Sequence, residues 1–369
     1  MKTAATLLFC LGATGAAMAL DLPSELKPVP VATGFTSLEG PAWSDLEQCL
    51  YFSNQGKPFG VFRYVPGTGS SLVHDYESKV NGNVVLDDGS VVTCESGNRR
   101  LVRRSSEGEF SVLVEGLEGQ PLNPPNDVIA KRDGTLWFTT PNWPSNDRQF
   151  VITYDPQRGK ARPVVTDVEK PNGLGFSPDE SWLYVMDSDR NQILRYPVTA
   201  DGSVGPGEAW VTDLGGTPDG MTVDHQGNVY ACVWDDRHPQ GGLHIISPSG
   251  ERLAHVAIPG NTTNCTFGGP HRQQLYITSG DTLYLLDLAD VYPIERPKVS
   301  IQRVPSYGLV IVQWEAVPGQ RYWVEVSADG KSWERVADPT QLGAGSTVRT
   351  YLSKRMDAHS FRVHPVWDQ

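Results

Sequence analysis

A short motif that recurs six times constrains the fold of this chain more than any other feature. Each copy opens on a residue with a side-chain oxygen, and an apolar, strand-like run follows 10 or 11 residues later. Successive copies lie 42 to 47 residues apart. A period in the mid-forties that contains several short strands is typical of a β-propeller blade. Six copies therefore predict an all-β, six-bladed β-propeller. The leading residues are Glu39, Asn81, Asn126, Asn172, Asp219 and Asn264.

These equivalent positions predict a polar ring around the propeller axis. The first strand of each blade lies along the central channel, so residues in one register of six such strands meet there. Carboxylates buried among amide oxygens are costly without a counter-charge, and a bound cation would supply it. The alternative is a structural polar belt, because Asn-Gly and Asp-Gly are also turn dipeptides. Two positions argue against turns alone. Glu39 is a poor turn residue, and Asn126 is followed by Asp127 and not by glycine.

The strand-like runs divide the chain into a propeller over residues 20–290 and a smaller module over residues 297–369. The sixth repeat has only three such runs, and residues 28–33 are predicted to supply its outer strand, which removes an exposed edge. Beyond a proline-containing linker, apolar and polar residues alternate at strand period. This module resembles a fibronectin type III-like β-sandwich, which could contact protein or carbohydrate or act as a passive spacer.

The first 19 residues have the pattern of a secretory signal peptide. Lys2 precedes an apolar run that ends in Ala17-Met18-Ala19, so cleavage is expected after Ala19. The run is too short to span a membrane, and a periplasmic or secreted location is predicted. The net charge of −12 comes without a basic cluster. Nucleic acid and anionic membranes are therefore not expected as partners.

The four cysteines beyond the signal segment fit neither a zinc-site spacing nor a disulfide scaffold. We expect Cys49, Cys94, Cys232 and Cys265 to be buried small hydrophobic residues. Cys232 and Cys265 lie in adjacent repeats, so a bridge between them is the one pairing left open. The sequence also lacks G-x-S-x-G, H-E-x-x-H and phosphate-binding glycine motifs. Serine-nucleophile, zinc-protease and nucleotide chemistry are therefore not predicted.

At the six repeats the chain resembles the gluconolactonase and senescence-marker-protein (regucalcin) family of six-bladed propellers. The likeness extends over residues 34–288, because six motifs occur in order at blade spacing. The motifs are LEGPAW at Leu38, NGNVVLDDGSVVTCESGNRR at Asn81, LNPPNDV at Leu122, PNGLGFSPDESWLYVMD at Pro171, PDGMTVDHQGNVY at Pro218 and TNCTFGGPHRQQLYIT at Thr263.

The resemblance implies one divalent cation in the channel and hydrolysis of sugar lactones. It implies Glu39, Asn172 and Asp219 as the metal ligands. Asn126 is similar to the family residue that faces metal and substrate beside them, and Asp219 is similar to the general base.

Three departures from the family pattern bear on the substrate rather than on the metal. Ser96 stands where bacterial relatives have a His, and Thr140 stands where they have a carboxylate. Pro124 replaces a Ser of the family motif before Asn126. These positions are predicted to line the wall of the substrate pocket.

Carboxylate and amide oxygens without thiolates favour hard cations. Calcium is expected, with magnesium, manganese or zinc as alternatives. The cation would polarise the lactone carbonyl, while Asp219 removes a proton from the attacking water. Activation of that water by the cation alone is the alternative. Asn126 and Asn123 would orient the substrate through hydrogen bonds.

A lactonase acting on a small sugar or aliphatic lactone is the leading functional hypothesis, and two others stay open. Phosphotriester hydrolysis would use the same cation on a P=O group. A non-catalytic, secreted binding propeller would use it as a structural ion. Fold alone does not decide, because propellers host both kinds of function.

Glu95 would contact substrate or pair with Arg99 or Arg100.

Overall fold

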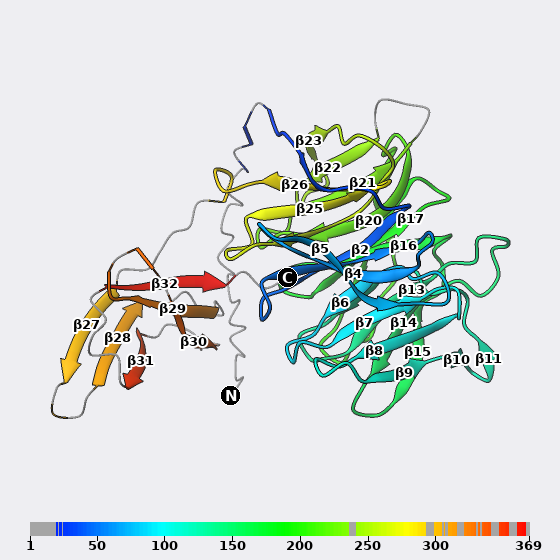
Figure 1. Cartoon of the computed structure of the whole chain (residues 1–369). Helices are drawn as coiled ribbons and strands as arrows, with labels where there is room; N and C mark the ends of the chain where they lie inside the picture. The colour runs from blue at the N-terminus through cyan, green and yellow to red at the C-terminus, as the bar shows by residue number, and fades with distance from the viewer. Residues whose placement is uncertain are drawn as a thin grey trace, which may run out of the picture.

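Six four-stranded antiparallel sheets succeed one another along the chain in the computed structural model, and Figure 1 shows their arrangement. The structure describes residues 20, 22, 23, 25–235 and 241–292 and, with gaps, the strands between 299 and 366. The first strands of neighbouring blades contact one another all the way around the axis. This is the six-bladed propeller that the repeat predicts.

The strands of each blade follow the chain from the axis outward. Those of the first three blades are β2 (Leu38–Ser44), β3 (Cys49–Asn54), β4 (Gly60–Val65) and β5 (Gly69–Asp75); β6 (Asn83–Val85), β7 (Val91–Glu95), β8 (Arg100–Arg104) and β9 (Phe110–Val114); and β12 (Val128–Ala130), β13 (Leu136–Thr140), β14 (Phe150–Asp155) and β15 (Lys160–Val165). A two-stranded ribbon, β10 (Gly116–Leu117) with β11 (Gln120–Pro121), precedes the third blade.

The last three blades repeat this order. Their strands are β16 (Pro171–Phe176), β17 (Trp182–Asp187), β18 (Gln192–Pro197) and β19 (Glu208–Thr212); β20 (Thr217–Val223), β21 (Val229–Trp234), β22 (Gly242–Ile246) and β23 (Arg252–Val256); and β24 (Thr262–Gly268), β25 (Gln274–Ser279) and β26 (Thr282–Asp287) with β1 (Val29–Ala32).

The N-terminal strand completes the sixth blade, as predicted from the missing outer run. β1 pairs antiparallel with β26, with Val29 opposite Leu285 and Ala32 opposite Leu283. Because β1 precedes the first blade and β26 belongs to the last, this pairing closes the circle of blades. It also covers the outer edge of β26, which would otherwise be open to further strand pairing.

Hydrophobic clusters lie between the blades rather than within them. Among the described residues, each neighbouring pair of blades shares one buried cluster. The second strand of a blade contributes to the clusters on both of its faces, which explains why these strands read as continuous apolar runs. In β17, for example, Leu183 packs towards blade three and Tyr184 towards blade five. The blades are thus held side by side around the channel.

The cysteines belong to these clusters. Cys49, Cys94, Cys232 and Cys265 are all buried and free, which confirms that they act as small hydrophobic residues. The bridge between Cys232 and Cys265 that the repeat left open is not formed. The Cys265 thiol instead donates a hydrogen bond to the carbonyl oxygen of Tyr230 at 3.4 Å.

The C-terminal module contains two three-stranded sheets, seen beside the propeller in Figure 1. One orders β27 (Val299–Val304), β28 (Leu309–Glu315) and β31 (Thr347–Ser353), and the other orders β30 (Glu334–Thr340), β29 (Arg321–Ser327) and β32 (Ser360–Val366). Val312 of β28 and Val324 of β29 belong to one buried cluster, so the two sheets share a core. The likeness of this module to fibronectin type III stays a prediction, and so do the domain boundaries.

The predicted signal segment, residues 1–19, lies outside the described residues. In the described part of the chain, no helix is both long and apolar enough to cross a membrane.

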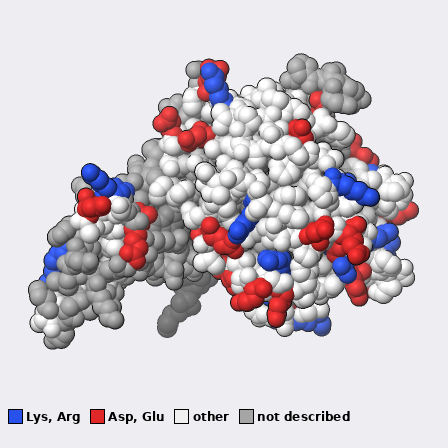
Figure 2. All heavy atoms as spheres, viewed as in Figure 1, with Lys and Arg blue, Asp and Glu red and all other residues white. Residues whose placement is uncertain are grey.

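On the face seen in Figure 2, acidic and basic side chains are interspersed over the described surface.

Candidate active site in the central channel

The inner strands approach one another most closely at the polar ring. Four ring residues are followed by glycine, and a Cβ atom at each glycine would collide with the next blade. On Gly40 it would lie 2.4 Å from the Asn81 carbonyl oxygen, and on Gly173 it would lie 2.6 Å from the Asp219 carbonyl oxygen. The glycines therefore permit a close approach of backbones, and consecutive ring residues are brought to neighbouring positions around the axis.

Glu39 lies in β2 with its carboxylate buried in the channel. Its Oε2 atom accepts a hydrogen bond from the backbone N–H of Gly40 at 2.6 Å and another from Asn264 Nδ2 at 3.3 Å. Burial raises the pKa of Glu39 well above its ordinary value, and repulsion from Asp219 and Asp127 raises it further. Three carboxylates therefore act on one another within the channel.

Asp219 is the predicted ligand that keeps partial access to solvent. It lies in β20, and burial raises its pKa to about 7 despite a hydrogen bond from the Asn172 side chain, which acts in the opposite direction. The charge of Asp127 contributes to the rise, and the exposed Lys79 opposes it. Asn172, in β16, also donates from Nδ2 to Ser188 Oγ at 3.2 Å. The structure therefore joins Asn172 to Asp219 and couples Glu39 to Asp219.

Asp127 belongs to this group although the sequence predicts no role for it. Its Oδ2 accepts a hydrogen bond from Asn264 Nδ2 at 3.2 Å, and its Oδ1 accepts one from the Val128 N–H at 2.9 Å. Burial raises its pKa to about 6. A Cβ on Gly82 would lie 2.5 Å from Asp127 Oδ1. The signal that could have found Asp127 is a carboxylate at a position where four other copies have glycine.

Asn264 links two of the carboxylates. Its Nδ2 donates to both Glu39 and Asp127, and its Oδ1 accepts a hydrogen bond from the Cys265 N–H at 2.8 Å. A Cβ on Gly220 would lie 2.1 Å from Asn264 Cγ, so this glycine leaves the space that the amide occupies.

The two predicted substrate-binding residues differ in their surroundings. Asn126 is buried beside Asp127 and is held through its backbone, with its N–H donating to Thr139 O at 2.9 Å. The amide of Asn123 donates from Nδ2 to Arg148 O at 2.9 Å, and its Oδ1 accepts from Arg99 Nη2 at 3.2 Å. Asn123 thus secures the loop after β13, and its contact with substrate stays a prediction.

Glu95 and two of the residues at the departures from the family pattern, Ser96 and Thr140, have local partners. Glu95 forms an ion pair with Arg100, which is one of the two roles expected for it. Ser96 Oγ donates to Pro125 O at 2.6 Å, and Thr140 Oγ1 donates to Phe150 O at 3.3 Å.

A cavity of about 570 Å³ occupies the far half of the channel. Asp127 and Asn264 line it together with apolar residues of the inner strands, among them Ile129, Leu174 and Met221. Asn264 therefore belongs both to the ring and to the lining of this cavity.

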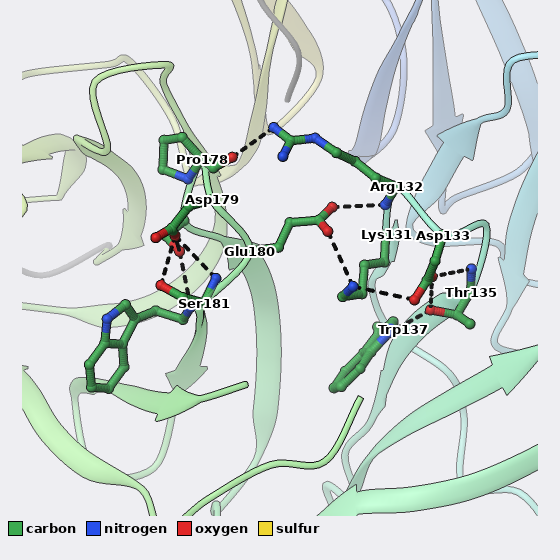
Figure 3. Close-up of polar contacts among 11 residues, drawn as sticks. Lys131, Arg132, Asp133, Thr135, Trp137, Pro178, Asp179, Glu180 and Ser181 are labelled. Atoms are coloured by element: carbon green, nitrogen blue, oxygen red, sulfur yellow. Dashed lines mark hydrogen bonds and ion pairs between the residues drawn. The ribbon is translucent and has the colours of Figure 1, made fainter. Parts of the chain in front are cut away.

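Charged turns of blades three and four contribute Lys131, Arg132 and Glu180 to the lining of the cavity, and Figure 3 shows their contacts. Lys131 Nζ lies 3.2 Å from Glu180 Oε2, and the Arg132 N–H donates to Glu180 Oε1 at 2.8 Å. Arg132 Nη2 also donates to Pro178 O at 2.7 Å. These bonds hold the two turns together, and the charge of Lys131 is paired with that of Glu180.

The donor set of the ring fits a hard divalent cation. In the part of the chain that the structure describes, no three His, Cys, Asp or Glu side chains are gathered as a metal site. Amide oxygens must therefore complete any site, and Asn172 stands beside Asp219 to do so. Buried carboxylates that repel one another gain most from a counter-charge. Oxygen ligands of this kind suit calcium or magnesium.

Fold and channel together define a six-bladed propeller with an oxygen-rich site at one end of its axis. The SMP-30/Gluconolactonase/LRE-like region matches residues 38–281, and the chain belongs to this family. The gluconolactonase of Zymomonas mobilis is 29% identical over 297 residues, covering 70% of this chain and 80% of that protein.

Two further relatives agree with this assignment. The 6-deoxy-6-sulfogluconolactonase of Pseudomonas putida is 30% identical over 250 residues, covering 65% of this chain and 82% of that protein. The solved structure of a gluconolactonase from Xanthomonas campestris superimposes with a TM-score of 0.66 at 29% identity, covering 74% of this chain and 92% of that one.

Proposed function

We propose that this protein hydrolyses a sugar lactone at the ring end of the channel, with one divalent cation held by Glu39, Asn172 and Asp219. The family has named members that open sugar lactones, which confirms the prediction of a lactonase. The metal dependence is the proposed part. The observation that carries it is the pair of buried carboxylates, Glu39 and Asp127, that one Asn264 amide bonds in the channel, together with Asp219, whose charge acts on Glu39.

The cation, when bound, supplies polarisation of the lactone carbonyl. The residues of the chain perform the remaining tasks. Asp219 is partly open to solvent and accepts a proton from the water that attacks the carbonyl carbon. The attack forms a tetrahedral adduct, and its collapse breaks the bond between the carbonyl carbon and the oxygen of the lactone ring. That oxygen takes the proton held by Asp219, and the product is a hydroxy acid. Asn126 lies beside this centre and orients the substrate by hydrogen bonds.

Gluconolactone hydrolysis by the purified chain tests the proposal. Acid release is measured at constant pH after treatment with chelator and again after addition of calcium. We expect hydrolysis to disappear with chelator and to return with calcium. Turnover that is unchanged in chelator would overturn the metal role. Calcium-dependent stability without turnover would favour a binding protein, and cleavage of an organophosphate alone would favour a phosphotriesterase.

Asp219→Asn tests the role of Asp219 as base. At saturating calcium we expect kcat to fall about 10²- to 10⁴-fold, the usual contribution of a general base. Calcium affinity measured by calorimetry shows whether the variant is loaded. A loaded variant with full activity would remove Asp219 from the proton transfer and leave activation of water by the cation.

We also propose that the chain is exported, with cleavage after Ala19, because residues 1–19 have the pattern of a signal peptide. Mass spectrometry of the protein recovered from the periplasm or medium tests this. A recovered chain that starts at Met1 inside the cell would contradict it.

A further inference from the structure

Two serines occupy equivalent positions in blades two and four. Ser96 follows β7 and Ser188 follows β17, and both are buried. Ser96 Oγ donates to the Pro125 carbonyl oxygen at 2.6 Å, and Ser188 Oγ donates to the Pro218 carbonyl oxygen at 2.7 Å. Each proline directly precedes a ring residue of the next blade. Both serines therefore tie their own blade to the start of the next inner strand.

Ser188 makes one contact that Ser96 does not make among the described residues. Its Oγ accepts a hydrogen bond from Asn172 Nδ2 at 3.2 Å. A hydroxyl group has a single proton to donate. Ser188 uses it in the hydrogen bond to Pro218 O, because a carbonyl oxygen can only accept. Ser188 can therefore only accept from Asn172. The NH₂ group of the Asn172 amide must face the serine.

This network determines which atom of Asn172 is available as a ligand. The amide nitrogen is engaged by Ser188, and the same side chain acts on the neighbouring Asp219 carboxylate, whose pKa it lowers. The oxygen Oδ1 then remains for a cation, which requires an oxygen and not an NH₂ group. The same serine holds the backbone immediately before Asp219.

We propose that Ser188 is a positioning residue that orients the Asn172 amide for cation binding and fixes it relative to Asp219. The inference rests on the proposed function, because it assigns the orientation of one of the proposed ligands. Removing a residue that hydrogen-bonds a metal ligand without itself binding the metal usually lowers metal affinity about 10- to 100-fold. Ser96 makes the same interblade bond without touching a ring side chain, so it is the matched control.

The experiment compares Ser188→Ala with Ser96→Ala in the full chain. Calcium affinity is measured by calorimetry, thermal stability is measured in chelator, and kcat and KM for gluconolactone are measured over a calcium series. Both variants lose an interblade hydrogen bond, so both should lose similar stability in chelator. We expect Ser188→Ala to bind calcium about 10- to 100-fold more weakly and Ser96→Ala to bind it with nearly the affinity of the parent. At saturating calcium, most of the lost kcat of Ser188→Ala should return.

Ser188→Thr, which keeps the hydroxyl group, should retain the calcium affinity of the parent. If Ser188→Ala does not fold, Ser188→Cys and Ser96→Cys replace the alanine pair, because the thiol fills the space of the hydroxyl instead of leaving a cavity and is only a weak acceptor. Equal calcium affinities in a matched pair of folded variants would overturn the positioning role.

The outcomes separate this inference from the proposed function. A parent protein that binds calcium and opens the lactone, with Ser188 and Ser96 variants alike, overturns only the role of Ser188. A parent that neither binds calcium nor opens the lactone overturns both.

Discussion

At the scale of single residues, the channel concentrates groups whose charge is unfavourable in the cation-free fold. Glu39, Asp127 and Asp219 all have a raised pKa, and burial is the main cause for each. Their partners are mostly neutral groups, such as the amides of Asn264 and Asn172. Such sites reduce stability in exchange for function.

This arrangement predicts an unusual dependence of stability on pH in the absence of metal. The pKa of Asp219 is about 7 in the folded state and about 3.9 in an unfolded chain. Between these values the folded state holds a proton that the unfolded state has released. The contribution of Asp219 to the free energy of unfolding is therefore fully present below about pH 3.9, and it is lost as the pH rises through about 7. Asp219→Asn removes the charge, and at pH 8 in chelator we expect it to raise the free energy of unfolding by about 1–2 kcal/mol.

Urea unfolding in chelator at pH 5 and pH 8 measures this effect. Asp88→Asn is the control, because the pKa of Asp88 is lowered by hydrogen bonds from Ser90 and the charge of Arg103 rather than raised. We expect that variant to gain nothing at pH 8. An Asp219→Asn protein that is no more stable than the parent at pH 8 would contradict the electrostatic account of the site.

At the scale of strands, the repeat predicted the blades and their closure because these depend on periodic patterns. Blade six lacked one run, and β1 supplies it. Asp127 stands out in the sequence only as a carboxylate where four other copies have glycine, and nothing in the repeat marks Ser188. Their roles arise from contacts across blades, Asp127 with Asn264 and Ser188 with Pro218. Such contacts depend on side-chain direction at the blade interface, which a repeat of mid-forties period does not encode.

The contact between β16 and β20 predicts contrasting effects for two glycines of one strand. A Cβ on Gly173 would lie 2.6 Å from the Asp219 carbonyl oxygen and from the Cα of Gly220, and backbone atoms cannot move aside. A Cβ on Gly175 would lie 3.0 Å from a methyl carbon of Val223 and 3.5 Å from the sulfur of Met221, both side-chain atoms. We expect Gly173→Ala to cost about 1–3 kcal/mol, as overpacking does.

Thermal unfolding of both variants tests this difference. Gly175→Ala should remain close to the parent in stability and in calcium affinity, while Gly173→Ala should lose both. Equal stability of the two variants would mean that the inner strands are less closely packed at the ring than the structure shows.

At the scale of the whole molecule, the propeller ends in an anchor that lies two residues beyond the predicted boundary at residue 290. Tyr292 is buried, its hydroxyl donates to Asp224 Oδ2 at 2.5 Å, and it also bonds the Tyr230 hydroxyl. Val291 packs in the same cluster between blades five and six. The propeller is therefore complete only when these two residues are present.

Two truncated chains test whether the propeller is self-sufficient from this point. A chain that ends at Tyr292 should keep the lactone kcat and urea midpoint of the propeller transition, because the site and all six blades precede it. A chain that ends at Asp290 loses a buried aromatic side chain and leaves Asp224 without its Tyr292 partner, so we expect a loss of about 3 kcal/mol. Tyr292→Phe in the full chain separates the two causes, because it removes only the hydroxyl and should cost about 1 kcal/mol. Equal instability of the two truncated chains would show that residues 293–369 support the propeller, and the C-terminal module would then be more than a passive spacer.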